Sequence, residues 1–480
     1  MNLPAPFVLS NRALLGNEAY EELLAALQQE PPVSIRMNPA KQPDEPIRAS
    51  LSEVPWCSTG HYLDQRLTFT FDPLFHAGCY YVQEASSMFL EQALKRYMPD
   101  DRVTMLDLCA APGGKSTHAR SVLPEGSLLV ANEVIRNRSQ ILAENLAKWG
   151  HPDVVVTNSD PSDFTSLTSF FNVILVDAPC SGEGMFRKDP NAIDEWSPEN
   201  VEICQQRQQR ILSDIWPCLR PGGILIYSTC TYNTKENEEN VQWMCNRFGA
   251  EVLEVDVPSG WGITGNLLPD ADFPVYRFFP HHTRGEGFFL AILRKPETGS
   301  EDHVPTFFSA DNTAFKRKDK RAVAAPVLVS KEHLATAKAW LLQPDAYQLS
   351  ISGTIVSAFN HSQLQQLATL SSVLRIVQAG IIIGEVKGKD VIPHHSLAMS
   401  SALRPGSFPT REVSYEQAIA YLRKEAISLP ETAPRGYVLL TYKAVPIGFV
   451  KNIGNRANNL YPQEWRIRSG YMPEEVRMLF

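Results

Sequence analysis

The sequence predicts an α/β fold in which a mainly parallel sheet is covered by helices on both faces. From Val103 onward, short apolar runs alternate with longer amphipathic runs. The apolar runs are continuous, as in strands that are buried on both faces. Strands that alternate with helices are typical of parallel sheets, which bind their ligands at the carboxyl ends of the strands. Candidate functional residues are therefore expected in the turns that follow these strands.

The expected elements follow one another along residues 103–249. Each strand is a short apolar run, and each helix is a longer segment of amphipathic character. The expected strands are 103–109, 127–133, 153–158, 173–179 and 222–230. The expected helices are 136–150, 198–220 and 235–249.

A chain of 480 residues is too long for one compact core, so two or three domains are expected. Residues 296–326 are polar, contain proline and end in a basic run, which predicts a linker. After it come a helical stretch near 331–342, strands near 374–386 and a glycine-punctuated hairpin of β-type residues. The predicted division is an N-terminal extension 1–95, the sheet domain 96–295, the linker 296–326, a small α+β domain 327–410 and a terminal module 411–480.

Composition favours a cytoplasmic protein. The apolar share of 44% and the charged share of 20% are ordinary for a globular chain. No apolar stretch approaches the roughly 18 residues of a membrane span, and the first residues lack a basic stretch before an apolar one. The 8 cysteines include no pair at CxxC spacing, which argues against a disulfide framework and a structural zinc site. We therefore expect no metal site, and single thiols become the candidates for chemistry.

The net charge of −8 is unevenly distributed. Residues 1–300 carry −14, whereas residues 301–480 carry +6. The basic C-terminal part could face a polyanion such as a nucleic acid. A simple solubility bias is the alternative. Nothing in the sequence requires a partner chain, so a monomer is expected.

The stretch "LDLCAAPGGKSTH", residues 106–118, is compatible with two kinds of ligand loop. Its end resembles a phosphate-binding loop of the form GxxxxGK[ST], but position 109 is Cys109 where that loop requires glycine. A P-loop NTPase therefore remains the weaker alternative. In the other interpretation, Gly113 and Gly114 form a close turn that lets S-adenosylmethionine lie against the backbone. Lys115 would then lie near the methionine and ribose end of the cofactor, with no phosphate to hold.

Two acidic residues follow this loop at suggestive positions. Glu133 lies 20 residues after Gly113, at the end of the second strand, where an acid hydrogen-bonds ribose hydroxyls in such folds. Asp160 follows the third strand and could meet the adenine amino group. It could equally cap the next helix.

Two cysteines stand just past strand ends, at the edge where ligands bind. Cys180 lies in "VDAPCSGEGMFRKDP" and Cys230 in "ILIYSTCTYNTKENEENV". A thiolate beside a methyl donor suits methylation of cytosine carbon 5, because addition to carbon 6 makes carbon 5 nucleophilic. Asp177, three residues before Cys180, could hydrogen-bond the polar edge of the ring. The residues alone do not decide which thiol attacks.

These motifs resemble the NOL/NOP2/Sun family of RNA cytosine-5 methyltransferases. The resemblance rests on "SIRMNP", "GCYYVQEASSMF", "DLCAAPGGKSTH", "VDAPCSGEGMFRKDP" and "YSTCTYNTKENEENV", and covers about residues 30–295. It implies a Rossmann-like methyltransferase domain with a mixed sheet, Cys230 as nucleophile and Cys180 as the thiol that assists resolution of the covalent adduct. It also implies that S-adenosylmethionine is bound by Cys109, Ala110, Ala111, Pro112, Gly113, Gly114, Lys115, Glu133, Asp160 and Asp177.

The plan of the whole chain is similar to bacterial methyltransferases of small-subunit ribosomal RNA of the RsmF type, which implies 16S ribosomal RNA as the partner. The short segment before "SIRMNP" departs from this plan, which puts an extra RNA contact there in doubt. Residues 445–467, "VPIGFVKNIGNRANNLYPQEWRI", are similar to the terminal PUA-like module of such enzymes. Within 436–468 basic residues are interleaved with Tyr442, Phe449, Tyr461 and Trp465, a mixture that suits backbone contact and base stacking with RNA. A core hairpin with solvated charges is the alternative, and a non-catalytic ribosome-assembly factor is the alternative for the whole chain.

Overall fold

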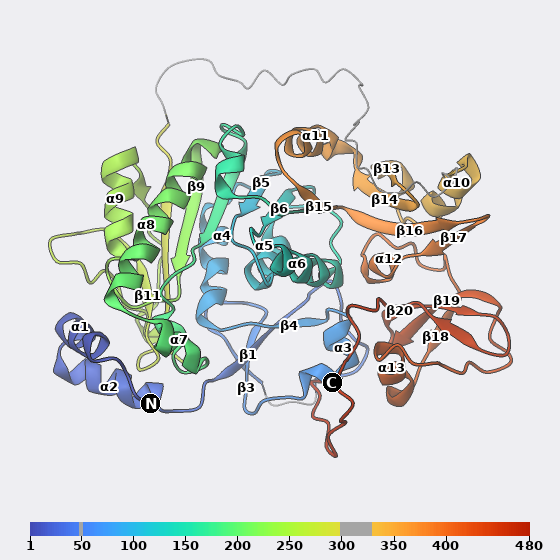
Figure 1. The fold of residues 1–480 in the computed structure, drawn as a ribbon, viewed down its shortest axis with the longest axis horizontal. Helices are drawn as coiled ribbons and strands as arrows, with labels where there is room; N and C mark the ends of the chain where they lie inside the picture. The colour runs from blue at the N-terminus through green and yellow to red at the C-terminus, as the bar shows by residue number, and fades with distance from the viewer. Residues whose placement is uncertain (48–50, 298–328) are drawn as a thin grey trace.

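A mixed sheet forms the centre of the molecule (Figure 1). The computed structural model describes residues 1–47, 51–297 and 329–480, so the predicted linker 296–326 lies almost wholly outside the described residues. Within them the sheet has nine strands in the order β10-β12-β9-β8-β5-β6-β7-β15, and β11 pairs with β12. The strands are β5 (Thr104–Asp107), β6 (Leu128–Asn132), β7 (Val154–Thr157), β8 (Phe171–Asp177), β9 (Leu219–Thr229), β10 (Glu251–Val252), β11 (Tyr276–Phe278), β12 (Phe288–Arg294) and β15 (Ile376–Ala379).

The five expected strands are β5 to β9, and they are parallel to one another. The antiparallel strands β12 and β15 extend this parallel set on its two sides. The prediction of a mixed sheet is therefore confirmed. The register pairs Asp177 with Ser228, so β8 and β9 end side by side. This register brings the turns with the two candidate thiols together.

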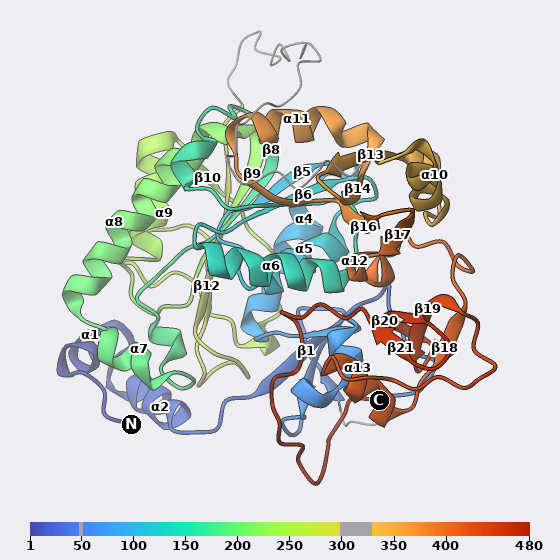
Figure 2. The ribbon, with the colours of Figure 1, turned by 45° about the vertical axis from the view of Figure 1, so that its right-hand side comes forward.

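Helices cover both faces of the sheet, as the continuous apolar strands predicted (Figure 2). Neighbouring residues of β5 show this arrangement, because Met105 belongs to the core on one face and Leu106 to the core on the other. One core includes residues of α4 (Leu90–Tyr97), α5 (Gly114–Val122) and α6 (Arg136–Trp149). The other core includes residues of α8 (Pro198–Ile215), α9 (Glu238–Phe248) and α11 (Leu364–Val373).

Strand β15 comes from the region predicted as a separate small domain, 327–410. It pairs antiparallel with β7, and Gly380 N donates to Val154 O at 2.9 Å. Helix α11, just before it, buries Leu370 in the same core as helices α8 and α9 of the central domain. The rest of this region forms a sheet of order β13-β14-β16-β17, with β13 (Tyr347–Ser352), β14 (Ile355–Asn360), β16 (Ile381–Lys387) and β17 (Asp390–Pro393). The helices α10 (Lys331–Ala339) and α12 (His395–Met399) flank it.

The N-terminal extension begins with two helices, α1 (Ala5–Leu15) and α2 (Asn17–Leu27). A sheet of order β2-β3-β1-β4 follows, with β1 (Val33–Met37), β2 (Leu51–Glu53), β3 (Gly60–Leu63) and β4 (Tyr80–Val82). The short helices α3 (Pro73–His76) and η2 (Ser86–Phe89) border β4 in the chain. Strand β4 and helix η2 lead directly into α4 of the central domain.

The terminal module contains the predicted hairpin. Strands β19 (Gly436–Tyr442) and β20 (Val445–Asn452) pair antiparallel around a turn in which Lys443 and Ala444 both have positive φ. With β18 (Thr410–Glu412) and β21 (Ala457–Asn459) they form a four-stranded sheet, next to α13 (Tyr415–Leu422). Residues of this module and of the N-terminal sheet share one hydrophobic core, which contains both Ile35 and Val450.

The prediction that aromatic side chains of 436–468 stack on RNA bases is wrong for most of them. Tyr442, Phe449 and Tyr461 are at most 6% exposed. They are buried because all three side chains belong to hydrophobic cores, so they cannot offer a ring face to a base. Trp465 also packs against that core.

No helix of the described ranges 1–47, 51–297 and 329–480 is both long and apolar enough to cross a bilayer.

Candidate active site

The two candidate thiols are in contact. Cys180 follows β8 and Cys230 follows β9, at the carboxyl ends of adjacent parallel strands. Their Sγ atoms lie 3.1 Å apart, and the Cys230 backbone N–H points at the Cys180 sulfur from 3.4 Å. Both side chains are partly exposed. The sequence-based expectation that both thiols meet at one edge of the sheet is confirmed.

The environment of Cys180 keeps its proton in place. The hydrogen bond with Cys230 and the burial of the sulfur raise the pKa of the Cys180 thiol well above its ordinary value. A thiol of this kind is a poor nucleophile at neutral pH, because the thiolate is the attacking species. It can still donate a hydrogen bond to a neighbouring sulfur. Cys180 is therefore suited to assist a reaction at Cys230.

A buried carboxylate in each cysteine loop holds the backbone of the other loop. Glu183, in the loop of Cys180, accepts hydrogen bonds from the backbone N–H groups of Tyr232 and Asn233, at 2.7 and 3.0 Å. These two residues directly follow the Cys230 turn. The other oxygen of Glu183 accepts from the Trp196 indole at 2.9 Å.

Glu236, in the loop of Cys230, makes the reverse contact. Its carboxylate accepts from the backbone N–H of Ser181 at 3.0 Å and from the amide of Gln208 at 2.7 Å, and also from the Ser181 hydroxyl. Glu183 and Glu236 are at most 1% exposed. We call these two residues the carboxylate clamp, since together they fix the separation of the two thiols. The sequence signal was an acidic residue a few positions after each cysteine, which was not recognised.

The predicted cofactor loop connects β5 with α5 beside a small cavity of about 170 Å³. Gly113 has a φ of +114°, and a Cβ there would lie 3.3 Å from Leu142, so glycine suits this turn. Of the predicted residues, those that line the cavity are Cys109, Ala110, Ala111, Pro112, Gly114, Lys115 and Asp177. Asp107 lines it as well.

Asp107 is a buried carboxyl with an unused acceptor. Its burial raises the pKa of the carboxyl to about 7, partly offset by a hydrogen bond from the Ser116 hydroxyl at 2.6 Å. Its other oxygen, Oδ1, is buried without a hydrogen-bond partner among the described residues. Such an orphaned polar atom in a cavity wall fits a ligand that brings its own donor. The cavity therefore fits the polar end of S-adenosylmethionine.

Lys115 and Asp177 connect the cofactor loop to the strand of Cys230. The Lys115 ammonium lies 2.9 Å from Asp177 Oδ2, and the Ser228 hydroxyl donates to Asp177 Oδ1 at 2.8 Å. Although burial opposes the charge of Lys115, the neighbouring Asp177 raises its pKa. Asp177 thus lies between the cofactor cavity and the thiols.

Glu133 is buried directly after β6 but does not line the small cavity. Its Oε1 accepts from the Ile135 backbone at 2.9 Å, and Arg138 lies 3.4 Å from Oε2. Arg138 also donates to the Ala111 carbonyl at 2.9 Å, which ties Glu133 to the cofactor loop. Next to Glu133, the side chains of Val134 and Ile135 are about half exposed and offer an apolar surface beside the carboxylate.

Asp160 caps a short helix, the alternative that the sequence left open. It precedes η3 (Pro161–Phe164), and its carboxylate accepts from the Ser162 backbone at 3.1 Å. Arg210 of α8 lies 3.6 Å from the same carboxylate. Contact with adenine stays a prediction for this residue.

The N-terminal extension supplies the opposite wall of the cofactor cavity. Tyr81, Gln83, Glu84 and Ser87 line it, all within the motif "GCYYVQEASSMF". The sequence singled out this motif but gave its residues no role. Behind the wall, the buried Arg36 donates to Gln83 at 2.9 Å, to Thr117 at 2.6 Å and to the carbonyl of Gly114. It lies in "SIRMNP" and joins the extension to the start of α5.

Among the described residues, one buried group has side chains of the types that bind metal ions. The ligand atoms of Cys57, Glu91 and His118 lie within 4.8 Å of one another. Glu91 already accepts hydrogen bonds from Ser58 and Lys95 and from the other two members of the group. The hydrogen bonds therefore show that the three side chains form an internal polar network.

Three family models match successive parts of the chain. Residues 3–85 match the N-terminal domain of 16S rRNA methyltransferase RsmF. Residues 94–294 match the model of 16S rRNA methyltransferase RsmB/F, and residues 408–467 match the PUA domain of methyltransferase RsmF. The matched ranges contain the cofactor loop, both thiols and the hairpin of the terminal module.

Similar proteins extend over nearly the whole length. The ribosomal RNA small subunit methyltransferase F of Klebsiella pneumoniae is 31% identical over 96% of this chain and 96% of its own. The chain belongs to the RsmF family of ribosomal RNA small subunit methyltransferases. The protein of the same name from Escherichia coli O139:H28 is 29% identical, with the same coverage.

Solved structures agree on the fold of the RsmF-family chain. A methyltransferase homolog from Pyrococcus horikoshii is 28% identical, with a TM-score of 0.50 over 61% of this chain and all of its own. NSun6 from the same organism, solved with SFG, is 21% identical, with a TM-score of 0.51 over 61% of this chain and 98% of its own. The predicted Rossmann-like methyltransferase domain, the PUA-like module and the cofactor S-adenosylmethionine are confirmed for this RsmF-family protein.

Proposed function

We propose that this RsmF-family chain methylates carbon 5 of a cytosine in 16S ribosomal RNA through a covalent adduct with Cys230. The observation that carries the proposal is the contact of the two thiols, 3.1 Å apart at adjacent strand ends, beside the cofactor cavity. A reaction at an unreactive ring carbon needs a thiolate next to a methyl donor, and this edge of the sheet offers both. The family names support ribosomal RNA as the substrate class.

We assign the attack to Cys230 because the resemblance to the NOL/NOP2/Sun family implies it, and the raised pKa of the Cys180 thiol supports this order. The Cys230 thiolate adds to cytosine carbon 6, and the electron pair of the ring double bond makes carbon 5 the nucleophile. After the methyl group has passed to carbon 5, a water molecule acts as the base and takes the proton from that carbon. The double bond then forms again and expels the Cys230 thiolate. A hydrogen bond from the Cys180 thiol stabilises this leaving group.

The cofactor is S-adenosylmethionine, which supplies an electrophilic methyl group when bound. The Cys109–Lys115 loop would hold its methionine end, where Asp107 keeps an unused acceptor. Glu133 would bind the ribose hydroxyls, and the exposed faces of Val134 and Ile135 would support the adenine ring. Asp160 would bind the adenine amino group, and Asp177 would orient Lys115 at the boundary with the target base.

Two substitutions separate the roles of the thiols. Cys230→Ala should abolish methyl transfer and leave no protein–RNA adduct, because no sulfur remains to attack. Cys180→Ala should accumulate the adduct, because the leaving sulfur has lost its hydrogen-bond donor. Transfer of labelled methyl groups to a 16S transcript and a band shift on denaturing gels measure the two outcomes.

Cys245→Ala is the matched control, a partly exposed thiol on α9, and should behave like the unaltered chain. Methyl transfer by the Cys230→Ala protein at the normal rate would overturn the assignment. If the unaltered chain binds 16S RNA but transfers no methyl group, the assembly-factor alternative holds instead.

A further inference from the structure

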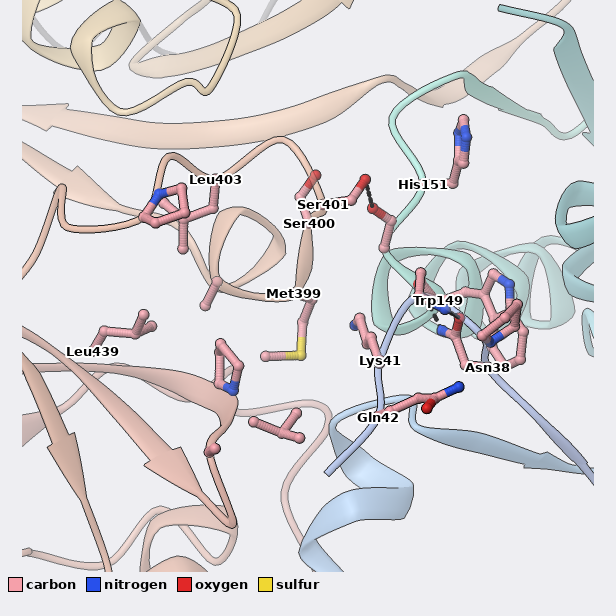
Figure 3. Close-up of a pocket in the computed structure, with 18 of the residues that line it drawn as sticks. Asn38, Lys41, Gln42, Trp149, His151, Met399, Ser400, Ser401, Leu403 and Leu439 are labelled. Carbon is pink, nitrogen blue, oxygen red and sulfur yellow. Dashed lines mark hydrogen bonds between the residues drawn. The ribbon is translucent and has the colours of Figure 1, made fainter. Parts of the chain in front are cut away.

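A cavity of about 630 Å³ lies where four parts of the chain meet (Figure 3). Its walls come from residues 38–42 after β1, from the end of α5 and the turn after α6, from residues 398–410, and from the β19–β20 hairpin. This volume is in the range of small-molecule and cofactor sites, which often form at domain interfaces. No part of the reaction proposed above uses this cavity.

The parts that form the cavity are joined closely. The turn after α6 contains Gly150, which has a φ of +91°. A Cβ at this position would lie 2.1 Å from the carbonyl oxygen of Met399. The Gly150 carbonyl in turn accepts from the Ser401 backbone at 3.0 Å. The cavity is thus set between firmly packed walls.

One side of the cavity is apolar. Met399 and Phe408 come from the region before the terminal module's hairpin, and Leu439, Val445 and Pro446 come from the hairpin itself. These side chains offer an apolar surface without hydrogen-bonding groups. A surface of this type suits the face of a nucleobase.

The other side carries positive charge. Lys41, Arg120 and Arg404 line the cavity, and Glu125 is the one carboxylate among the lining residues that the structure describes. Arg120 already donates to the backbone carbonyls of Ser127, Leu123 and Pro124. Figure 3 shows the Lys41 side chain directed toward the space that Met399 also faces. The Lys41 ammonium donates to the carbonyls of Ala77 and Lys148, at 2.9 and 2.5 Å. An ammonium group has three donors, so one remains for a ligand.

Arg404 stands at the rim and is exposed. Its Nε donates to the Ser407 hydroxyl at 3.3 Å, and its guanidinium can turn toward a bound anion. An apolar wall beside cationic side chains matches a nucleotide, which combines a flat base with a charged phosphate.

The cavity is separate from the methylation site. Helix α5 starts at Gly114, beside the cofactor cavity, and its other end, near Leu123, borders the larger cavity. Nine helical residues span about 13 Å. A nucleotide held here is therefore not the one whose base reaches Cys230.

We propose that this cavity binds one unpaired nucleotide of the RNA substrate, other than the nucleotide that is methylated. The inference rests on the proposed function, because it takes RNA as the substrate. RNA fits better than another polyanion, since proteins recognise it by unstacked bases, and the match to the RsmF PUA domain includes the hairpin and Phe408. The net charge of +6 on residues 301–480 also favours the binding of a polyanion such as RNA.

The first test removes the rim cation. Binding of a 16S transcript by Arg404→Gln should weaken several-fold, and the slope of log affinity against log salt should fall by about one. Arg411→Gln is the matched control, since Arg411 is exposed on β18, seven residues further along the chain, but does not line the cavity. Its binding and salt slope should stay unchanged. Equal effects of the two variants would overturn the proposal in favour of a diffuse basic surface.

The second test locates the nucleotide directly. A 16S transcript that contains 4-thiouridine should crosslink under ultraviolet light to peptides that contain Lys41 or Met399. Gln42 is exposed and lines the cavity, so Gln42→Trp should fill the cavity and abolish these crosslinks. Crosslinks that map only elsewhere would overturn the proposal. The proposal would also be overturned if free nucleoside monophosphates bound tightly in the cavity while Arg404→Gln bound RNA normally.

The two proposals fail separately. Arg404→Gln and Gln42→Trp should raise the KM for RNA several-fold, whereas the control Arg411→Gln should leave both the KM and the methylation rate unchanged. Normal methylation with an unchanged salt slope would refute the nucleotide site alone. Absence of methylation in the unaltered chain would refute the proposed function.

Discussion

The carboxylate clamp determines how the two thiols face each other. Glu183 and Glu236 each accept hydrogen bonds from the backbone of the opposite loop, and both are fully buried. The Glu236 carboxylate accepts hydrogen bonds from the backbone N–H and the hydroxyl of Ser181 and from the amides of Gln208 and Asn233. A glutamine amide cannot meet all of these donors, because in either orientation its NH2 group would face at least one N–H group, at a cost of about 1–3 kcal/mol.

We expect Glu236→Gln to lower kcat by about tenfold or more, since a barrier change of 1.4 kcal/mol is tenfold. The Kd for S-adenosylmethionine should stay unchanged, because Glu236 does not line the cofactor cavity. Steady-state kinetics and calorimetry would separate the two quantities. Glu202→Gln is the control, an exposed carboxylate that pairs with Lys235 near the same loop. Unchanged kcat in Glu236→Gln would mean that the clamp has no part in positioning the thiols.

The roles of single residues were predictable only where they depend on the local sequence. Cys180 and Cys230 were found because each stands directly after an apolar run. The clamp was not, because its contacts depend on the register of β8 with β9, which pairs Asp177 with Ser228. The sequence also could not tell that Tyr442, Phe449 and Tyr461 face a core, since the same residue types serve base stacking and burial.

At the scale of elements, strand β15 joins the C-terminal region to the central sheet. It pairs with β7 along Ile376, Gln378 and Ala379, and it closes an edge that would otherwise expose unpaired backbone groups. The strands β5 to β9 were predicted from their apolar runs, but a pairing between segments more than 200 residues apart leaves no local signal. The small domain predicted at 327–410 therefore shares its core with the central domain through α11.

We expect Gln378→Pro to separate this strand from β7. Proline has no backbone N–H, so a ladder hydrogen bond is lost and the partner carbonyl is left unpaired, at about 1–3 kcal/mol. Amide hydrogen exchange in β7 should increase, and limited proteolysis should release the C-terminal region earlier. Gln378→Thr keeps the N–H and serves as the control. Equal exchange in both variants would show that β15 does not protect β7.

At the scale of the whole molecule, buried histidines make stability depend on pH. Burial lowers the pKa of His76 to about 3 and that of His151 to about 3, and it lowers the pKa of His118 and of His394 to about 4. The unfolded chain has ordinary histidines, with a pKa near 6.5. Below pH 6.5 these histidines bind protons in the unfolded state but stay neutral in the folded state. The free energy of unfolding therefore falls as the pH falls toward 4.

The melting temperature should therefore drop between pH 6.5 and pH 4. A pKa shift of one unit changes the free energy of unfolding by about 1.4 kcal/mol. Half of the pKa shift of His76 would therefore lower the free energy of unfolding by roughly 2 kcal/mol. His76→Gln should flatten the profile, because the amide can replace the hydrogen bond between His76 and the Thr70 carbonyl without titrating. Differential scanning calorimetry at several pH values measures the effect. A profile as steep as that of the unaltered chain would rule out His76 as a contributor.

The strand pairing of β15 also bears on how the polypeptide could be divided. Because β15 belongs to the sheet of the preceding domain, and the terminal module shares a core with the N-terminal sheet, non-covalent contacts join the two sides of residues 298–328. Two separately encoded fragments, ending at Glu297 and beginning at Val329, should then assemble into one particle. Such fragment complementation would make methyl transfer a reporter of whether two fused partners meet.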